Sequence, residues 1–192
     1  MSQDDQIRWD RQHAERQTEQ EAAPFLRAIF ESQRWDVPPG RALDIACGRG
    51  RHALFLVERG FEVTAVDISP VALAHGAERA RKKSFSISWQ QADLENYTLE
   101  PGAYGLIVNI DYLQRSLLPM IKAALKVGGL VIFETYLNDQ QTVGHPKNPN
   151  YLLRHNELLE SFRDFRVLYY REGRIIENDE RSFRAGIFAQ KR

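Results

Sequence analysis

Residues 42–52 read Ala-Leu-Asp-Ile-Ala-Cys-Gly-Arg-Gly-Arg-His, an apolar run that leads into a glycine turn. They predict a short buried strand over 41–47, a turn at Gly48 and Gly50, and a helix that continues through Glu58. Glycine has no Cβ, so a Gly-x-Gly turn between a strand and a helix lets the backbone approach a ligand closely. The stretch therefore predicts a ligand site where a buried strand ends.

An acidic residue, Asp67, stands at the end of the next expected strand, 19 residues beyond Gly48 (67 − 48). Neighbouring parallel strands bring it beside the glycine turn at the carboxyl edge of the sheet, where open α/β sheets bind ligands. A carboxylate there can accept hydrogen bonds from two vicinal hydroxyls, so Asp67 is predicted to hold a ribose. The structural alternative is that the glycines form only a tight turn and Asp67 only caps the following helix.

Strands and helices alternate after the glycine turn. Strands are expected at 61–66, 85–91, 104–110 and 130–135, with helices at 69–82 and 111–126. This alternation predicts an α/β fold in which a doubly wound, mostly parallel sheet carries helices on both faces. Right-handed crossovers then leave few topologies.

The two ends of the chain depart from this alternation. Residues 1–40 are polar and form a helical lead-in that stops at Pro38-Pro39-Gly40. After the core at 41–135, residues 136–155 contain a polar loop that is either a lid or a surface connector. Residues 156–192 contain a helix at 156–162 and strands at 165–170 and 184–189, which predict an antiparallel hairpin. The whole chain, 1–192, is expected to form one domain.

Charge and composition exclude several classes of partner. Lys plus Arg and Asp plus Glu number 26 each, so the formal net charge is zero and no nucleic-acid partner is expected. Cys47 has no partner for a disulfide, which fits a reducing compartment. Residues 2–5 do not resemble a signal peptide, and no apolar stretch approaches the roughly 20 residues that span a bilayer. We expect a cytoplasmic protein, a monomer or weak homodimer, with no membrane partner.

A nicotinamide-dependent oxidoreductase is the main alternative, because Gly48-x-Gly50-x-x-Ala53 also satisfies the dinucleotide fingerprint. Three features count against it. The glycine strand follows a long helical lead-in, and the closing hairpin is unlike a second mononucleotide-binding half. Asp44 within the first strand would repel a pyrophosphate, whereas it can reach a cationic amino-acid group directly or through water.

Five short motifs resemble, in order and spacing, those of the class I S-adenosylmethionine-dependent methyltransferases, and within them the small tellurite-resistance-like group. They are Asp44–Gly50, Val66–Ser69, Gln91–Leu94, Tyr104–Asn109 and Leu125–Leu130. The resemblance covers the chain from about Arg41 to the C-terminus. It implies a seven-stranded sheet that ends in the hairpin, S-adenosyl-L-methionine as cofactor and methyl transfer as activity.

The resemblance also implies roles for single residues. The acid of the second motif, Asp67, holds the ribose, and that of the third, Asp93, binds the adenine amino group while its neighbour supplies backbone. Residues 9–13 look like a family lead-in with tyrosine where this chain has His13, so a stacking role does not carry over. The expected cofactor-binding residues are Asp44, Ala46, Cys47, Gly48, Gly50, Asp67, Ile68, Asp93, Leu94 and Asn109.

Methyl transfer from a sulfonium is an in-line displacement, so the protein must align the acceptor and exclude water. A base is needed only when the acceptor arrives protonated. Past the fourth strand, Asp111 could be that base or a helix cap, and Tyr112 could face the sulfonium or fill the core.

Three further residues are candidates for binding the acceptor. They are His52, Arg115 and Arg154, each with a packing or surface role as the alternative. The remaining histidines share no metal-ligand spacing, so no metal is expected. The leading hypothesis is a methyltransferase acting on a small molecule. The alternatives are an NAD(P)-dependent oxidoreductase and a non-catalytic cofactor-binding module.

Overall fold

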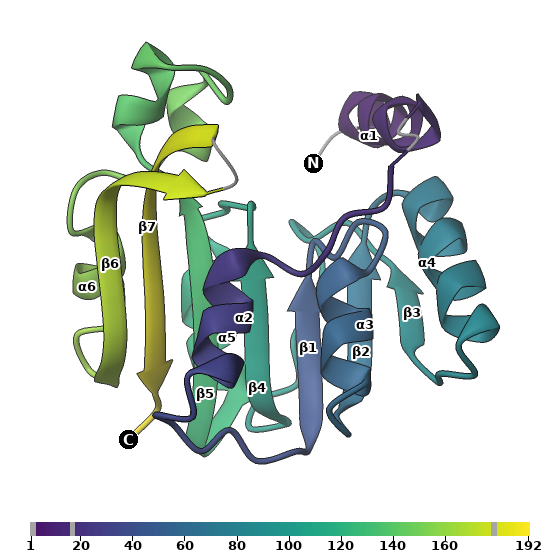
Figure 1. Ribbon diagram of the computed structural model, residues 1–192, viewed down its shortest axis with the longest axis horizontal. Helices are drawn as coiled ribbons and strands as arrows, with labels where there is room; N and C mark the ends of the chain where they lie inside the picture. The colour runs from purple at the N-terminus through teal and green to yellow at the C-terminus, as the bar shows by residue number, and fades with distance from the viewer. Residues whose placement is uncertain (1–2, 16–17, 178–179) are drawn as a thin grey trace.

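A twisted sheet runs through the centre of the computed structural model, which describes residues 3–15, 18–177 and 180–192 (Figure 1). Within these residues the sheet has seven strands in the order β3-β2-β1-β4-β5-β7-β6. The first five strands are parallel, and β7 is antiparallel to both β5 and β6. The strands are β1 (Arg41–Ile45), β2 (Glu62–Asp67), β3 (Ser88–Gln91), β4 (Tyr104–Ile110), β5 (Leu125–Tyr136), β6 (Arg166–Glu177) and β7 (Glu180–Gln190). The predicted doubly wound sheet with a C-terminal hairpin is confirmed.

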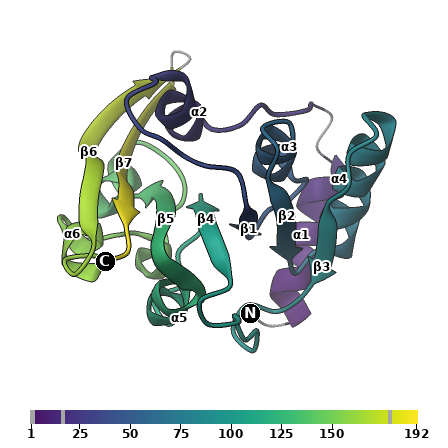
Figure 2. The same ribbon diagram turned by 90° about the horizontal axis from the view of Figure 1, so that it is seen from below.

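Helices cover both faces of this sheet, as Figure 2 shows in a view from below. One face carries α2 (Pro24–Glu31), α3 (Arg51–Val57) and α4 (Pro70–Lys82), and the other carries α5 (Leu117–Ala124) and α6 (Glu157–Ser161). Successive strand residues point to opposite faces, so Leu106 and Val108 pack with α2 and α3 while Ile107 packs with α5. Strands buried on both faces explain the nearly continuous apolar runs.

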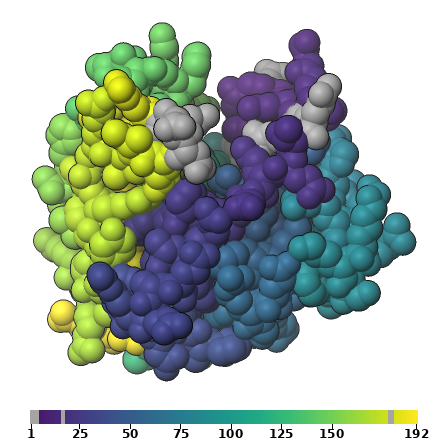
Figure 3. Space-filling view, in the orientation of Figure 1, coloured from purple at the N-terminus to yellow at the C-terminus, as the bar shows by residue number. Residues whose placement is uncertain are grey.

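Helix α1 and the C-terminal residues lie at opposite ends of the central strands (Figure 1). Helix α1 (Gln3–Glu15) lies beyond the carboxyl ends of the parallel strands and packs against α4. Near the other end of the chain, the backbone N–H of Lys191 donates to Gly129 O at 2.8 Å, and its Nζ donates to Leu125 O at 2.7 Å. The space-filling view shows the surface hollowed between α1 and the ends of β6 and β7 (Figure 3).

Several predicted elements are shorter than expected, and the difference is largest in two of them. The helix predicted at 111–126 begins only at Leu117, because Asp111 takes a left-handed conformation (φ 64°) and interrupts the chain after β4. The strand predicted at 85–91 begins at Ser88. Residues before it close α4 instead, since Ser84 also has a positive φ and Phe85 N donates to Ala80 O.

The strands toward the C-terminus are longer than predicted. Strand β5 starts at Leu125 and contains the expected glycine turn as an irregularity, with Gly128 at φ 78°. Strand β6 continues to Glu177 and strand β7 begins at Glu180, so both extend beyond the predicted strands at 165–170 and 184–189. Residues 171–177 pair with 180–186 in the same antiparallel ladder. Residues 178 and 179, part of the predicted connector, lie outside the described residues, as do residues 1, 2, 16 and 17 of the expected lead-in.

The predicted polar loop contains short helical turns, and residues near its start are buried. It contains two 3₁₀ helices, η1 (Asn138–Thr142) and η2 (Pro149–Tyr151), after a first residue that still belongs to β5. Leu137 and Gln140 are buried. The Gln140 amide accepts from Phe183 N at 2.8 Å and donates to His145 O at 3.0 Å. The predicted polar loop is therefore packed against the rest of the fold at its start.

Candidate functional site

The two glycines of the turn after β1 are needed for different structural reasons. A Cβ on Gly48 (φ 53°) would lie 3.3 Å from His13 Cε1 of α1, so this glycine allows α1 to approach the turn. A Cβ on Gly50 (φ 72°) would lie 2.3 Å from the Trp89 ring. Gly50 is therefore required by packing against β3, a reason that the sequence did not predict. Trp89 thus has a packing role at this turn.

Asp67 lies beside this turn, as predicted. Gly48 N donates to its Oδ2 at 2.8 Å, and Ser69 N donates to its Oδ1 at 2.9 Å. Burial raises the pKa of Asp67, and the two backbone N–H groups oppose that shift only in part. The N-cap of α4 is Ser69, whose Oγ accepts from Ala72 N, so the alternative that Asp67 caps the helix is wrong. The Ser69 hydroxyl also donates to Asp10, which ties α1 to the same edge.

Asp44 and His52 form a buried pair below the turn. Both are almost inaccessible to solvent, at 0% and 4% exposure. Asp44 Oδ2 accepts from Ala53 N at 3.0 Å, and Asp44 Oδ1 lies 3.7 Å from His52 Nδ1. Cys47 is also buried, and burial together with the charges of Asp44 and Asp67 holds the pKa of its thiol well above the usual range. Cys47 is thus a small packing residue rather than a nucleophile.

The third motif lies next to Asp67 along the sheet edge. Ala92 N donates to Asp67 O at 3.0 Å, and the turn that follows contains Asp93. The Asp93 carboxylate accepts from Glu95 N at 3.0 Å and from Asn96 Nδ2 at 3.2 Å. Leu94 is fully buried in the core, so only its backbone can serve a ligand. The structure thus brings the Asp93 turn beside the Asp67 strand end.

The other predicted cofactor residues frame the same edge. Ala46 has a positive φ of 51° at the start of the turn, and Ile68 is buried directly after β2. Asn109 is buried near the end of β4, and its Nδ2 donates to Tyr112 O at 2.7 Å. This bond holds the segment after β4 against the strand that carries it.

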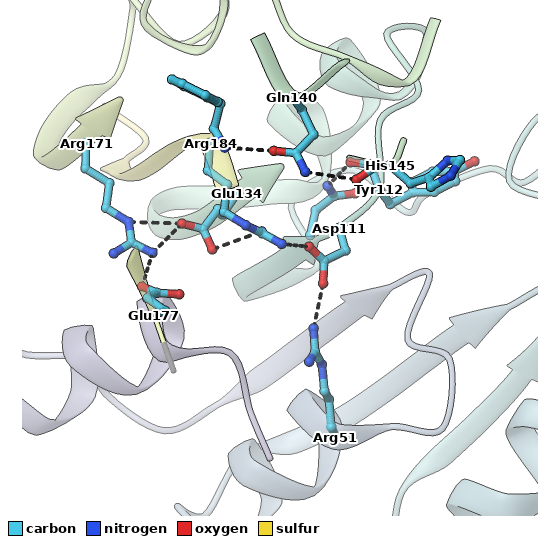
Figure 4. Close-up of polar contacts among 11 residues, drawn as sticks. Arg51, Asp111, Tyr112, Glu134, Gln140, His145, Arg171, Glu177 and Arg184 are labelled. Atoms are coloured by element: carbon cyan, nitrogen blue, oxygen red, sulfur yellow. Dashed lines mark hydrogen bonds and ion pairs between the residues drawn. The ribbon is translucent and has the colours of Figure 1, made fainter. Parts of the chain in front are cut away.

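Asp111 is held by two arginines from distant parts of the chain (Figure 4). Arg51 donates to its Oδ2 at 2.6 Å and Arg184 to its Oδ1 at 2.7 Å. Burial acts to raise the pKa of Asp111, but Arg184 and Arg51 outweigh it and the net pKa is lowered. A carboxylate with a lowered pKa is a weak base. The cap alternative is wrong, since α5 starts six residues later (117 − 111).

Arg184 also joins Asp111 to a second, deeper carboxylate (Figure 4). Glu134 on β5 is 1% exposed and accepts from Arg171 at 2.6 and 3.0 Å, with Arg184 at 3.4 Å. Burial raises the pKa of Glu134 in spite of these two arginines. The Arg184 guanidinium also lies 4.0 Å from the centre of the Tyr136 ring. We call Arg51, Asp111, Glu134, Arg171 and Arg184 the edge network.

Tyr112 is half-buried near the carboxylates of the sheet's carboxyl edge. Its hydroxyl donates to Gln114 Oε1 at 2.6 Å. Burial, with the charges of Glu95, Asp93 and Asp67, raises the pKa of Tyr112 well above its ordinary value. The phenol therefore stays protonated and can act only as a hydrogen-bonding or packing group.

The two arginines predicted to bind acceptor both contact Glu157. Arg115 pairs with it at 2.6 Å and also donates to the carbonyls of Asn150 and Leu152, so it fastens the loop after β5 to α6. The Arg154 side chain is 74% exposed and approaches Glu157 at 3.4 Å. Neither is joined by a hydrogen bond or ion pair to the edge network within the described residues, and the contacts of Arg115 favour a bracing role.

The edge network was not predicted from the sequence. The two residues of each hydrogen-bonded pair are 37 to 73 positions apart in the sequence, so no local motif connects them. One signal was present: Glu134 interrupts the apolar run Val131-Ile132-Phe133, and a charge inside a buried strand needs a partner. Arg51, directly after the glycine turn, carried no comparable signal.

The described residues contain neither a candidate metal-binding group nor a candidate membrane-spanning helix. Residues 3–15, 18–177 and 180–192 contain no group of three or more His, Cys, Asp or Glu side chains suited to a metal ion. Over the same residues, none of the helices is both long and apolar enough to cross a bilayer.

Comparisons with known proteins point in one direction. A family model described as a methyltransferase domain matches residues 42–129. The "Probable S-adenosyl-L-methionine-dependent methyltransferase TehB" of Haemophilus influenzae is 28% identical over 153 residues, which cover 75% of this chain and 53% of that protein. The "Putative methyltransferase YqeM" of Bacillus subtilis is 30% identical over 106 residues, 50% of this chain and 42% of that protein. The chain thus spans about half the length of these curated relatives.

Solved structures share the fold. The crystal structure of TehB from Haemophilus influenzae superposes with a TM-score of 0.75 at 24% identity, covering 91% of this chain and 64% of that one. A [4+2]-cyclase, SpnF, superposes with a TM-score of 0.67 at 18% identity, covering 92% of this chain and 84% of that one. At these identities the likeness concerns the fold alone, and one of the two proteins is named for a different reaction.

Proposed function

Because the chain carries a methyltransferase domain on the fold of the S-adenosylmethionine-dependent methyltransferases, we propose that it transfers a methyl group from S-adenosylmethionine to a small-molecule acceptor. The predicted family, fold and cofactor are confirmed. The acceptor and the site residues are the proposal, together with a cytoplasmic location and a monomeric or weakly dimeric state.

The residues at the carboxyl edge suit this cofactor. Asp67 would hold the ribose hydroxyls, Asp93 the adenine amino group, and Asp44 the ammonium of the amino-acid end. Two observations support the fit: Gly48 has no side chain at the turn, and the buried Asp44 Oδ1 has no hydrogen-bond partner among the described residues. When bound, S-adenosylmethionine supplies a methyl group activated by a sulfonium.

The edge network and Tyr112 border the place where an acceptor would lie, past β4. The arginines hold Asp111 ionised and fixed, so its carboxylate can orient an acceptor better than it can remove a proton. Tyr112 would align the acceptor through its protonated phenol. The small-molecule class rests on the zero net charge, since no basic excess favours a polyanionic substrate.

The observation that carries the proposal is Asp67 placed against the glycine turn at 2.8 Å from Gly48 N. Charge-assisted bonds to ribose contribute about 1.5–3 kcal/mol each. Calorimetry with S-adenosylhomocysteine should therefore show about ten- to a hundredfold weaker binding by Asp67→Ala. The exposed Asp36 provides a matched control, and Asp36→Ala should bind as the unchanged protein does. Unchanged affinity in a folded Asp67→Ala variant would remove Asp67 from the site.

Thermal-shift titration distinguishes the alternatives, because a ligand stabilises only a fold that binds it. S-adenosylhomocysteine should raise the melting temperature and NADH should not. The reverse result would favour the oxidoreductase. A screen of small-molecule acceptors then separates the enzyme from a non-catalytic module, since cofactor binding without any methylated product would support the module.

A further inference from the structure

Two consecutive residues between β4 and α5, Gln114 and Arg115, contact two parts of the molecule that are far apart in the sequence. Gln114 Nε2 donates to the carbonyl oxygen of Leu94 at 3.2 Å, in the turn after β3. Arg115 donates to the carbonyl oxygens of Asn150 and Leu152 at 3.2 and 2.8 Å, in the loop after β5. The two residues therefore connect the turn where we propose that the adenine binds with the loop that leaves the same edge of the sheet.

The amide of Gln114 is held at both of its polar atoms. The Leu94 carbonyl oxygen can only accept a hydrogen bond, so Nε2 must face it. The same nitrogen donates to Ser116 Oγ at 2.9 Å, and Oε1 accepts from the Tyr112 hydroxyl at 2.6 Å. A rotated amide would bring two oxygen atoms together at Leu94. Gln114 thus has one favoured orientation, in which it joins Tyr112 to the turn after β3.

The backbone beneath these two side chains is fixed by the start of α5. Leu117 N donates to Gln114 O at 3.0 Å, and Leu118 N donates to Arg115 O at 3.2 Å. The Arg115 guanidinium is also paired at 2.6 Å with Glu157, which is buried. Because the backbone and both side chains are held, the position of the turn after β3 and that of the loop after β5 depend on each other.

Tyr112 provides a second connection between the same two regions. Asn109 Nδ2 donates to its backbone oxygen at 2.7 Å, which holds Tyr112 against β4. Burial raises the pKa of its phenol, and the nearby Asp93 and Tyr151 add to that shift. Asp93 belongs to the turn after β3, and Tyr151 belongs to η2 of the loop after β5. The phenol that Gln114 orients therefore lies close to both regions.

We propose that Gln114 is a positioning residue that couples cofactor binding at the turn after β3 to ordering of the loop after β5. This inference rests on the proposed function and adds a regulation of its site. An adenine bound at Leu94 fixes the turn, Gln114 and Arg115 transmit that constraint, and the carbonyls of residues 150 and 152 become more firmly held. The loop is then more ordered with the cofactor bound than without it, which prepares the site for the acceptor.

Hydrogen exchange measures this coupling. The Tyr151 amide donates to Asn148 O at 3.0 Å, and the Leu152 amide donates to Pro149 O at 3.1 Å. Exchange of these two amides therefore reports how well η2 is ordered. Saturating S-adenosylhomocysteine should slow their exchange by about fivefold or more in the unchanged protein, since coupling between two sites typically changes an equilibrium by that factor or more.

Two variants remove the connection in different ways. Gln114→Met keeps the length of the side chain and removes all three hydrogen bonds, whereas Gln114→Glu keeps an acceptor for Tyr112 but has no N–H for Leu94 O. Neither should show slower exchange when saturated with S-adenosylhomocysteine. Ser116→Ala is the matched control, because it removes a bond of the same amide nitrogen and leaves the contacts to Tyr112 and Leu94. It should show the slowing seen in the unchanged protein.

The outcomes separate this inference from the proposed function. Calorimetry with S-adenosylhomocysteine shows that each variant is folded and saturated. Slowing that persists in either Gln114 variant would overturn the inference. Binding to the unchanged protein without any slowing would also overturn it and would leave the proposed function standing. If the unchanged protein did not bind S-adenosylhomocysteine at all, the proposed function would fail first and this inference with it.

Discussion

At the scale of single residues, the glycine turn shows that one motif can serve two purposes. Gly48 leaves its backbone open beside α1, whereas Gly50 has no room for a Cβ because the Trp89 ring lies where it would be. Gly76 on α4 meets the same ring, with a Cβ at 2.6 Å. Trp89 is thus seated between two glycines, and the helix after the turn is positioned by β3 as well as by β1.

Gly50→Ala should therefore destabilise the protein through packing. The left-handed conformation costs roughly 1–2 kcal/mol for alanine, and forcing a methyl group against the indole adds about 1–3 kcal/mol. We expect a loss of about 2–5 kcal/mol in urea denaturation. Gly102→Ala is the matched control, because Gly102 has a similar φ of 65° with nothing within 4 Å of its Cβ position. Equal losses in the two variants would show that Trp89 contributes nothing.

The sequence predicts residue roles well only where they depend on nearby residues. Asp67 was found because strand length and turn type place it beside Gly48. The purpose of Gly50 was missed because Trp89 comes 39 residues later (89 − 50), on a strand whose register the motif does not contain. Glu134 signalled a buried partner, but only the folded hairpin identifies it as Arg171 and Arg184.

At the scale of elements, the segment after β5 is the part whose role is least constrained by the sheet. Its first turn is fixed by Gln140, and its far end is fixed by Arg115. Between them, the Val143 side chain is 51% exposed. A segment anchored at both ends and exposed in the middle suits a lid that moves as a unit over the acceptor.

Shortening this exposed middle tests whether it acts as a lid. We expect replacement of residues 143–148 by a short Gly-Ser link to abolish most turnover with an acceptor found by screening. Affinity for S-adenosylhomocysteine should change little, because the residues proposed to hold the adenosine, Asp67 and Asp93, lie at the end of β2 and just after β3. Full activity after the replacement would show that the segment is a surface connector. Gln140→Ala, which removes the hydrogen bonds that anchor the segment, should lower the stability of the protein in addition to its turnover. The loss of stability distinguishes the anchoring role of Gln140 from the role of residues 143–148 in covering the acceptor.

Element types were predictable, but several element ends were not. Apolar runs and glycines identify the core strands β1, β2, β4 and β5, whereas β3 was predicted from alternating residues. The late start of α5 depends on Asp111, whose left-handed backbone accompanies its bonds to Arg51 and Arg184. The extension of β6 and β7 beyond the predicted limits depends on pairing between the two strands. Both features arise from tertiary contacts, which periodicity in the sequence does not contain.

At the scale of the whole molecule, the edge network joins five parts of the fold. Arg51 comes from α3, Asp111 follows β4, and Glu134, Arg171 and Arg184 come from β5, β6 and β7. Arg184 is central, since it contacts both carboxylates. The hairpin is thereby fastened to the half of the sheet that carries the glycine turn.

Arg184→Leu should destabilise the whole domain by about 3 kcal/mol at neutral pH, because the buried Glu134 loses one of its two cations. Removing Arg184 raises the pKa of Glu134 further above that of an unfolded glutamate. The folded variant then binds a proton that the unfolded chain does not, so its deficit should shrink as the pH falls toward about 5. Arg174→Leu, at an exposed arginine of β6, should cost less than about 1 kcal/mol at any of these pH values. A deficit in Arg184→Leu that does not depend on pH would contradict this account of Glu134.

The placement of the two chain ends has a practical consequence for handling the protein. Helix α1 lies at the carboxyl edge, so a purification tag or dye joined before it would stand near the edge where we propose that the cofactor binds. The last residues lie at the far edge, held by the bonds of Lys191 to Gly129 and Leu125. A biotin or sensor-chip linker attached after Arg192 would therefore leave the proposed binding edge facing the solution.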